Sequence, residues 1–189
     1  KTPGKCILKD DMPELLDKVN NADVMIFATS LYDFSMSGQM KIFIDRLLPI
    51  IEPFFSKRNG KMAPSIRRNR SWKTILISNE GFLEKEHFDI LVSHMNKMAS
   101  FWGECDGLCE MILRTQGECM KQPKYEDKMK EITKALEKAG KEFAVYEKIN
   151  KKTLDIIEQP FSQASLTEVI DRGNKMWERL ISENTNIVH

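Results

Sequence analysis

The sequence lacks any apolar run of the roughly 18 to 20 residues that a membrane span requires, and its first residues, Lys1 to Lys5, open no signal peptide. It also lacks a charge excess, because 29 Lys and Arg residues stand against 28 Asp and Glu residues, for a net charge of +1. A protein that binds nucleic acid or an anionic membrane through bulk charge would be far more basic. We therefore expect a cytoplasmic protein whose partner is a small molecule or another protein.

Cysteine is scarce as well. The four cysteines could form two disulfides, but a chain of this size without a secretory signal can keep them reduced, so free thiols are expected. Cys105 and Cys109 have no second cysteine pair and no histidine nearby, which favours core cysteines over a zinc site. No Gly/Ser-rich linker divides the 189 residues, so the length predicts one domain.

The most informative stretch runs from Asp23 to Leu48. Residues 23–29 form a nearly continuous apolar run, typical of a strand that is buried on both faces of a parallel sheet. Residues 30–36 then alternate polar and aromatic side chains, at the place where an open α/β sheet binds its ligands. Ser37 is a suitable N-cap for the amphipathic helix that follows.

The rest of the chain alternates between helix and strand patterns. The expected elements are a helix over 11–20, strands over 72–78 and 108–113, a helix over 88–98 closed by Gly103, and helices over 125–149 and 166–181, the last capped by Ser165. Residues 57–70 are predicted to form a polar, basic surface segment without regular structure. Three strands that alternate with helices predict a parallel sheet with helices on both faces.

Three parallel strands are few for a stable open sheet, and an apolar strand left unpaired at its edge would promote aggregation. We therefore expect that a strand and a helix of the same domain precede Lys1. On this interpretation residues 1–189 are one domain, incomplete at its N-terminus, with a helical extension at its C-terminus.

Several motifs occur together in a recognisable order. They are FATSLY over 27–32, SMSGQMK over 35–41, FIDR over 43–46, Gly4-Lys5-Cys6, Asp10-Asp11-Met12 and Asn79-Glu80-Gly81-Phe82. The chain resembles the branch of the flavodoxin-like fold that contains NADPH-dependent FMN reductases and iron-sulfur flavoproteins. This resemblance implies a flavodoxin-like three-layer α/β sandwich, a parallel sheet with helices on both faces. The chain departs from the family at Ser30, where a proline is usual, and the family's phosphate-binding loop would lie before Lys1.

The resemblance also implies a function. FMN would supply the redox chemistry, with NAD(P)H as reductant and a flavin, quinone or iron-sulfur acceptor, and no catalytic side chain would be required. The alternatives are an electron carrier or flavin-binding module without its own substrate, and an interaction protein that has lost flavin.

Two loops are implied to bind FMN, with aromatic rings that pack on the isoalloxazine and polar groups along its edge. The residues are Thr29, Ser30, Leu31, Tyr32, Asp33, Phe34, Ser35 and Met36 in the first loop and Asn79, Glu80, Gly81 and Phe82 in the second. From the pattern alone, the aromatic residues could equally face the core, and Gly81 could be an ordinary turn glycine.

Other features leave alternatives open. Cys6 stands where a compact cysteine run ends in iron-sulfur flavoproteins, so it is either a [4Fe-4S] ligand or a free thiol. The run Arg67–Arg70 could attract the phosphates of NADPH, although a solvated loop is favoured. His87 and His94, seven residues apart on a helix, are predicted to lie on the surface. The apolar faces of the last two helices, and the tendency of the family to pair, predict a homodimer or higher homo-oligomer.

Overall fold

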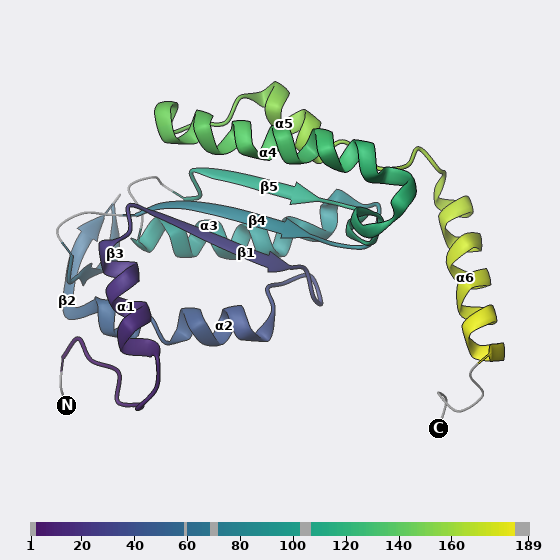
Figure 1. Cartoon of the computed structure of the whole chain (residues 1–189). Helices are drawn as coiled ribbons and strands as arrows, with labels where there is room; N and C mark the ends of the chain where they lie inside the picture. Colours follow the sequence, from purple (N-terminus) through teal and green to yellow (C-terminus); the bar gives the residue numbers. More distant parts are fainter. Residues whose placement is uncertain (1–2, 59, 69–71, 103–106, 184–189) are drawn as a thin grey trace. The chain divides into compact units, whose positions relative to one another are not determined.

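The computed structural model describes residues 3–58, 60–68, 72–102 and 107–183. The chain separates into two compact units, Lys1–Gln159 and Pro160–His189. The first unit contains α1 (Met12–Asn21), β1 (Val24–Ser30), α2 (Gly38–Asp45), β2 (Ile51–Arg58), β3 (Lys61–Ile66), β4 (Lys73–Asn79), α3 (Asp89–Trp102), β5 (Glu110–Arg114), α4 (Glu126–Tyr146) and α5 (Lys151–Glu158) (Figure 1). The second unit contains α6 (Leu166–Glu183).

A three-stranded parallel sheet forms the centre of the first unit, with strand order β1-β4-β5. The pairing of β1 with β4 is regular from Val24 opposite Lys73 to Ser30 opposite Asn79. The carboxyl ends of both strands therefore finish at the same level. Residues Gly103 and Cys105, for which a helix end and a core position were expected, lie outside the described residues.

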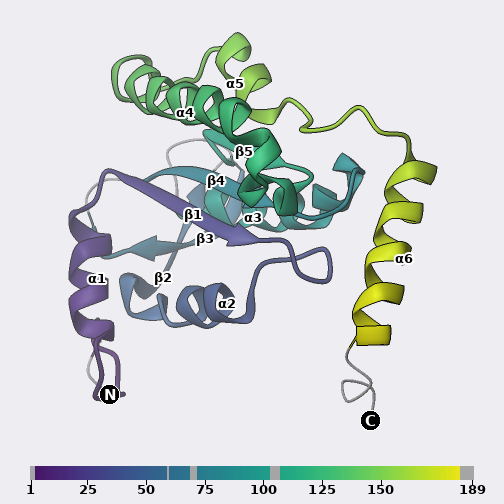
Figure 2. The ribbon, with the colours of Figure 1, turned by 45° about the vertical axis from the view of Figure 1, so that its right-hand side comes forward.

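Helices cover the sheet on both faces. α2 and α3 lie on one side and α4 and α5 on the other, as the two views agree (Figures 1 and 2). The buried residues accordingly form two clusters: one joins Phe27 and Leu76 to Leu91 and Met95 of α3, and the other joins Ile75 and Ile112 to α4 and α5. The expected parallel sheet between helices, consistent with a flavodoxin-like fold, is confirmed.

β1 differs from the expectation in its burial. Met25, Phe27 and Thr29 are buried, but Ile26 on the opposite face is 57% exposed, so the predicted burial of this strand on both faces is wrong. The reason is positional. β1 is an edge strand, and α4 and α5 pack against Ile75 and Ile112 of the two other strands, leaving the Ile26 face uncovered by the described residues.

Part of the segment predicted to lack regular structure is a β-hairpin, so that prediction is wrong. β2 and β3 pair antiparallel, and Gly60 adopts the left-handed φ of +76° in the connection. Pro53 concealed the first strand in the sequence, because proline is rare in strands. It is tolerated here because the pairing shifts register between Ile51 and Phe55, where the ladder is interrupted.

The helix predicted over 125–149 ends earlier, at Tyr146. Glu147 takes a left-handed conformation with a φ of 56°, and its N–H donates to the carbonyl of Phe143, a C-terminal stop that no glycine signals. Asn150 then caps α5, accepting from the N–H of Lys152 at 2.9 Å. Gly140 lies within α4, which continues through it to Tyr146.

The second unit consists mainly of α6, whose predicted start is confirmed. Ser165 Oγ accepts from the N–H of Glu168 at 3.3 Å, while the N–H of Ser165 donates to the Glu168 carboxylate at 2.7 Å. This is a capping box. Among the described residues, α6 and the other helices include none that combines the length and apolarity of a membrane span.

Candidate functional site

The two loops that the sequence singled out meet at the carboxyl edge of the sheet. Ser30 lies opposite Asn79 in the parallel ladder, and the N–H of Leu31 donates to the Asn79 carbonyl at 2.9 Å. Side chains of both loops therefore face the same space, which is where open α/β sheets bind ligands.

The first loop is a tight aromatic turn. The N–H of Tyr32 donates to the Ser35 carbonyl and the N–H of Ser35 to the Tyr32 carbonyl, both at 2.9 Å. Asp33 and Phe34 between them both have positive φ, 46° and 61°. Non-glycine residues pay roughly 1–3 kcal/mol each for such conformations, and they cluster at functional sites. In this turn Tyr32 and Phe34 point outward, and they are 63% and 50% exposed.

Buried residues anchor this loop at both ends. The Thr29 hydroxyl donates to the Ser30 carbonyl and accepts from the N–H of Ser37, each at 3.0 Å. Ser37 in turn caps α2, accepting from the N–H of Met40 at 3.2 Å. Met36 is buried in the core, so its side chain anchors the end of the loop to the hydrophobic cluster.

The second loop is braced by the segment after β5. The N–H of Gly117 donates to the Glu80 carbonyl at 2.6 Å, and the N–H of Gln116 donates to the Phe82 carbonyl at 3.0 Å. A Cβ at Gly117 would lie 3.0 Å from Asn79 Nδ2 and 3.1 Å from the Glu80 carbonyl oxygen, so only glycine fits this contact without a shift. The bracing leaves the Phe82 ring 68% exposed beside the first loop.

His87, predicted to lie on the surface of the same helix as His94, instead lies in a short 3-10 helix beside the two loops and is only partly exposed. Its Nδ1 lies 3.0 Å from Glu80 Oε2, and its ring makes edge contacts with Phe34, at 5.3 Å between centroids, and with Phe82, at 5.5 Å. The 3-10 helix Lys85–Phe88 turns His87 back toward the loops. Because helical periodicity does not report such a turn, the only available signal was the proximity of His87 to Asn79–Phe82 along the chain.

A cavity of about 330 Å³ lies beside the loops, on the face of the sheet that carries α4. Ser30, Asn79 and Ile77 line it, together with Ser78. Ser78 Oγ, on the face of β4 that Leu76 shares, is buried without a hydrogen-bond partner among the described residues. The edge thus offers space and polar groups next to the aromatic rings.

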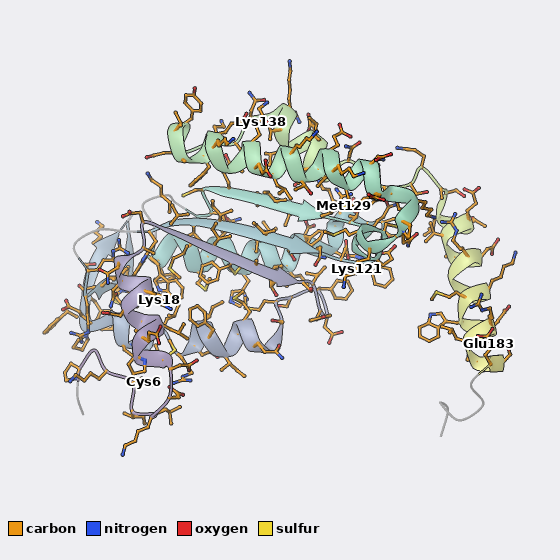
Figure 3. All side chains as sticks on the ribbon, in the orientation of Figure 1. Cys6, Lys18, Lys121, Met129, Lys138 and Glu183 are labelled. Atoms are coloured by element: carbon orange, nitrogen blue, oxygen red, sulfur yellow. The ribbon has the colours of Figure 1, made fainter. Side chains whose placement is uncertain are left out.

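Cys6 lies elsewhere in the first unit. It precedes α1 and lies far from Lys121, the last residue of the 3-10 helix Gly117–Lys121 that follows β5 (Figure 3). Arg46 donates to Cys6 Sγ at 3.3 Å and pairs with Asp10 at 2.8 Å. The hydrogen bond from Arg46 lowers the pKa of the Cys6 thiol, and another from Arg46 lowers the pKa of Asp10. Among the described residues, no three His, Cys, Asp or Glu side chains gather as a metal site would require.

The arginine run is engaged within the protein. Arg67 Nε donates to the Pro49 carbonyl at 3.0 Å. Arg68 donates to the Ala22 carbonyl at 2.6 Å and lies over the Trp72 ring, where it covers the end of α1. Arg70 lies outside the described residues. These contacts give Arg67 and Arg68 structural roles.

The residues at the carboxyl edge fit a planar aromatic ligand with a polar rim, such as FMN. Exposed rings from both loops supply stacking surfaces. Glu80 Oε1 is buried without a hydrogen-bond partner among the described residues, which costs about 1–3 kcal/mol that a ligand N–H would offset. The parallel α/β fold thus presents, at the carboxyl ends of adjacent strands, the edge at which open α/β sheets bind ligands.

Comparisons with known proteins show that this chain is similar to flavoproteins. Residues 1–67 match the family described as NADPH-dependent FMN reductase. An iron-sulfur flavoprotein of Archaeoglobus fulgidus is 29% identical over 100 residues, which cover 53% of this chain and 39% of that protein. An iron-sulfur flavoprotein of Methanocaldococcus jannaschii is 30% identical over 105 residues, 54% of each chain. The chain is thus related to the FMN reductases and iron-sulfur flavoproteins, as its motifs predict, and the matches span about half or less of these relatives' lengths.

Proposed function

We propose that this chain provides the flavin-binding part of an FMN-dependent oxidoreductase that takes electrons from NAD(P)H and passes them to a flavin, quinone or iron-sulfur acceptor. The observation that carries the proposal is the meeting of the strained aromatic turn at Tyr32–Ser35 with the braced loop at Asn79–Phe82. The proposed protein is a flavodoxin-like domain with a helical C-terminal extension, and it acts in the cytoplasm, where NAD(P)H is available.

When bound, FMN would supply hydride acceptance and electron transfer. Tyr32, Phe34 and Phe82 would contact its ring, while Ser35 and the loop backbone would hydrogen-bond its polar edge. Because the two loops are tied at Leu31 and Asn79, their separation is fixed before the ligand arrives. Such preorganisation reduces the entropic cost of binding.

FMN titration, followed by fluorescence quenching, tests the proposed site. The double variant Phe34→Ala/Phe82→Ala is expected to weaken FMN binding, whereas Phe54→Ala/Phe55→Ala, which removes two exposed rings from the hairpin, serves as the matched control. Equal affinities of the two double variants would reject this location of the ligand.

Steady-state oxidation of NAD(P)H by the full-length, flavin-loaded protein separates the proposed enzyme from its alternative, an electron carrier or flavin-binding module without its own substrate. Turnover with a small quinone supports the enzyme. Electron exchange with a partner protein alone supports the carrier. Full-length protein that takes up no FMN would instead favour an interaction protein.

Cys6 is proposed as one ligand of a [4Fe-4S] cluster in the full-length protein. The supporting observation is its thiol, whose lowered pKa favours the thiolate that binds iron. Iron and sulfide analysis with a visible spectrum provides the test. Loss of the broad cluster absorption in Cys6→Ser, and its retention in Cys119→Ser, would support the assignment.

We also propose that the protein forms a homodimer or higher homo-oligomer through α6. Exposed apolar side chains recur along this helix at spacings of three, four and seven residues, so they share a face that a second helix can contact. They include Leu166, Ile170, Trp177 and Leu180. Sedimentation at micromolar concentration tests this: Trp177→Ala should weaken association, Lys175→Ala should not, and a monomer for the unmodified protein would refute it.

A further inference from the structure

His87 occupies a sheltered but reachable position in the candidate site. Its side chain is 28% exposed, while that of its partner Glu80 is 3% exposed. The rings of Phe34 and Phe82 meet the imidazole edge-on, at interplanar angles of 78° and 83°. One aromatic residue comes from each loop, so the imidazole stands between the two surfaces proposed to hold the flavin.

The contact with Glu80 fixes the chemistry of the two ring nitrogens. Because a carboxylate can only accept, we assign to Nδ1 the hydrogen that points to Glu80 Oε2. Nε2 is then the ring nitrogen left to contact a ligand. The backbone of Glu80 is held in place, because its N–H donates to the Arg114 carbonyl and its carbonyl accepts from the N–H of Gly117.

Several charged residues lie near this pair in the described structure. Lys85 and Glu86 flank His87 along the chain, and Lys85 is paired with Glu158. Asp33 belongs to the turn that carries Phe34, and Glu118 approaches Gly81. Of the charged residues named here, Glu80 is the one whose side chain contacts the His87 imidazole in the described structure.

We propose that His87 is a catalytic proton donor to the electron acceptor, that Glu80 is its positioning residue, and that the acceptor is a small quinone; this inference rests on the proposed function. NAD(P)H would supply two electrons and one proton, and FMN, when bound, would supply the means of their transfer to the quinone. The second carbonyl oxygen of the quinone takes a proton from Nε2 of the imidazolium. The products are the hydroquinone, NAD(P)⁺ and neutral His87, which regains its proton from water.

Quinones fit these surroundings better than one-electron acceptors do. An iron-sulfur centre takes up an electron without needing a proton, so it has no use for a positioned imidazole. A quinone ring needs both an aromatic surface and a proton for each oxygen. The flavin ring held by Phe34 and Phe82 would provide the first, next to His87, which provides the second.

The kinetic test compares two acceptors in the flavin-loaded, full-length protein: a benzoquinone, which needs protons, and ferricyanide, which does not. In His87→Gln, the ratio of quinone to ferricyanide kcat is expected to fall about 100-fold, the scale of general acid catalysis. The solvent deuterium isotope effect on quinone reduction should also change. His94→Gln, which alters an exposed histidine of α3, should leave the ratio unchanged.

A second test needs no turnover. Nitrogen-15 NMR of the flavin-free chain reports which ring nitrogen of His87 carries the hydrogen in neutral imidazole. We expect Nδ1 to carry it, and the Glu80→Gln variant should shift the population toward the Nε2 tautomer. A neutral ring protonated at Nε2 in the unmodified chain would overturn the proposed orientation.

The outcomes separate this inference from the proposed function. If the loaded protein oxidises NAD(P)H with both acceptors and His87→Gln keeps the unmodified ratio and isotope effect, the proton-donor role is rejected while the oxidoreductase stands. If neither acceptor supports turnover, the oxidoreductase itself is rejected, and the proton-donor role is rejected with it.

Discussion

The hydroxyl of Thr29 accepts a hydrogen bond from the backbone N–H of Ser37 at 3.0 Å. This bond joins the end of β1 to the N-cap of α2, on either side of the aromatic loop. Thr29 is buried, so water cannot readily replace this bond. The loop is therefore closed by one side chain, and that side chain is a direct target for mutation.

Thr29→Val is expected to lower the free energy of unfolding by about 1–3 kcal/mol, because it leaves the Ser37 N–H without its acceptor. It should also weaken FMN binding by loosening the loop. Urea denaturation and FMN titration measure both effects. Thr29→Ser keeps the hydroxyl and is the control, with a smaller loss of about 1 kcal/mol for the missing methyl group. If serine costs as much as valine, the hydrogen bond does not close the loop.

Phe34→Asn separates the strain of the turn from the function of its ring. Asparagine tolerates a positive φ better than phenylalanine, so stability is expected to stay equal or to rise by up to about 1 kcal/mol. FMN affinity should fall about tenfold, the scale of one aromatic contact. The same change at Phe54, an exposed ring of the hairpin, should leave FMN affinity intact. A variant that is both less stable and fully able to bind FMN would contradict this account.

Neighbouring residues of β1 should respond very differently to mutation. Phe27→Ala is expected to cost about 3–5 kcal/mol, because the ring is buried against the core. Ile26→Lys should cost no more than about 0.5 kcal/mol, because its side chain is exposed. Thermal or urea denaturation of the chain compares them. A loss of 2 kcal/mol or more in Ile26→Lys would mean that another copy or another segment covers this face in solution.

Cys6 should react as a thiolate at a lower pH than an ordinary thiol does. Its pKa is lowered chiefly by the hydrogen bond from Arg46, so the alkylation rate should rise with pH through a midpoint below the usual range. In Arg46→Met that midpoint should move to higher pH. Mass spectrometry of iodoacetamide-treated, cluster-free chain measures the profile. Lys41→Met removes an exposed charge of the same helix, and an identical shift there would assign the effect to bulk charge.

The sequence predicted the elements whose signals are local and repeated. The start of α6 followed from Ser165 and its apolar spacing, and β1 and β4 followed from their apolar runs. The hairpin was missed because Pro53 sits at a register shift, which composition cannot show. The stop of α4 was misplaced because Glu147, a residue without a turn preference, adopts the left-handed conformation.

The candidate site likewise has one part that the sequence predicted and another part that it did not. The two loops could be found because each follows an apolar strand, and parallel pairing brings such loops together. The pairing of Glu80 with His87 depends on one turn of 3-10 helix and on ring contacts across the two loops. The burial of β1 was overestimated because an apolar run reports what a strand can bury and says nothing of which neighbours cover it.

The parallel ladder between β1 and β4 also governs when the site appears during folding. Its partners are distant along the chain, so they meet late compared with the helical contacts, which form between near neighbours. A slip of one residue in this ladder would turn the side chains of β1 to the opposite face and move Leu31 away from the Asn79 carbonyl. The candidate ligand-binding edge therefore forms in one register alone. A ligand that contacts both loops would bind chains in this register and not chains whose strands have slipped.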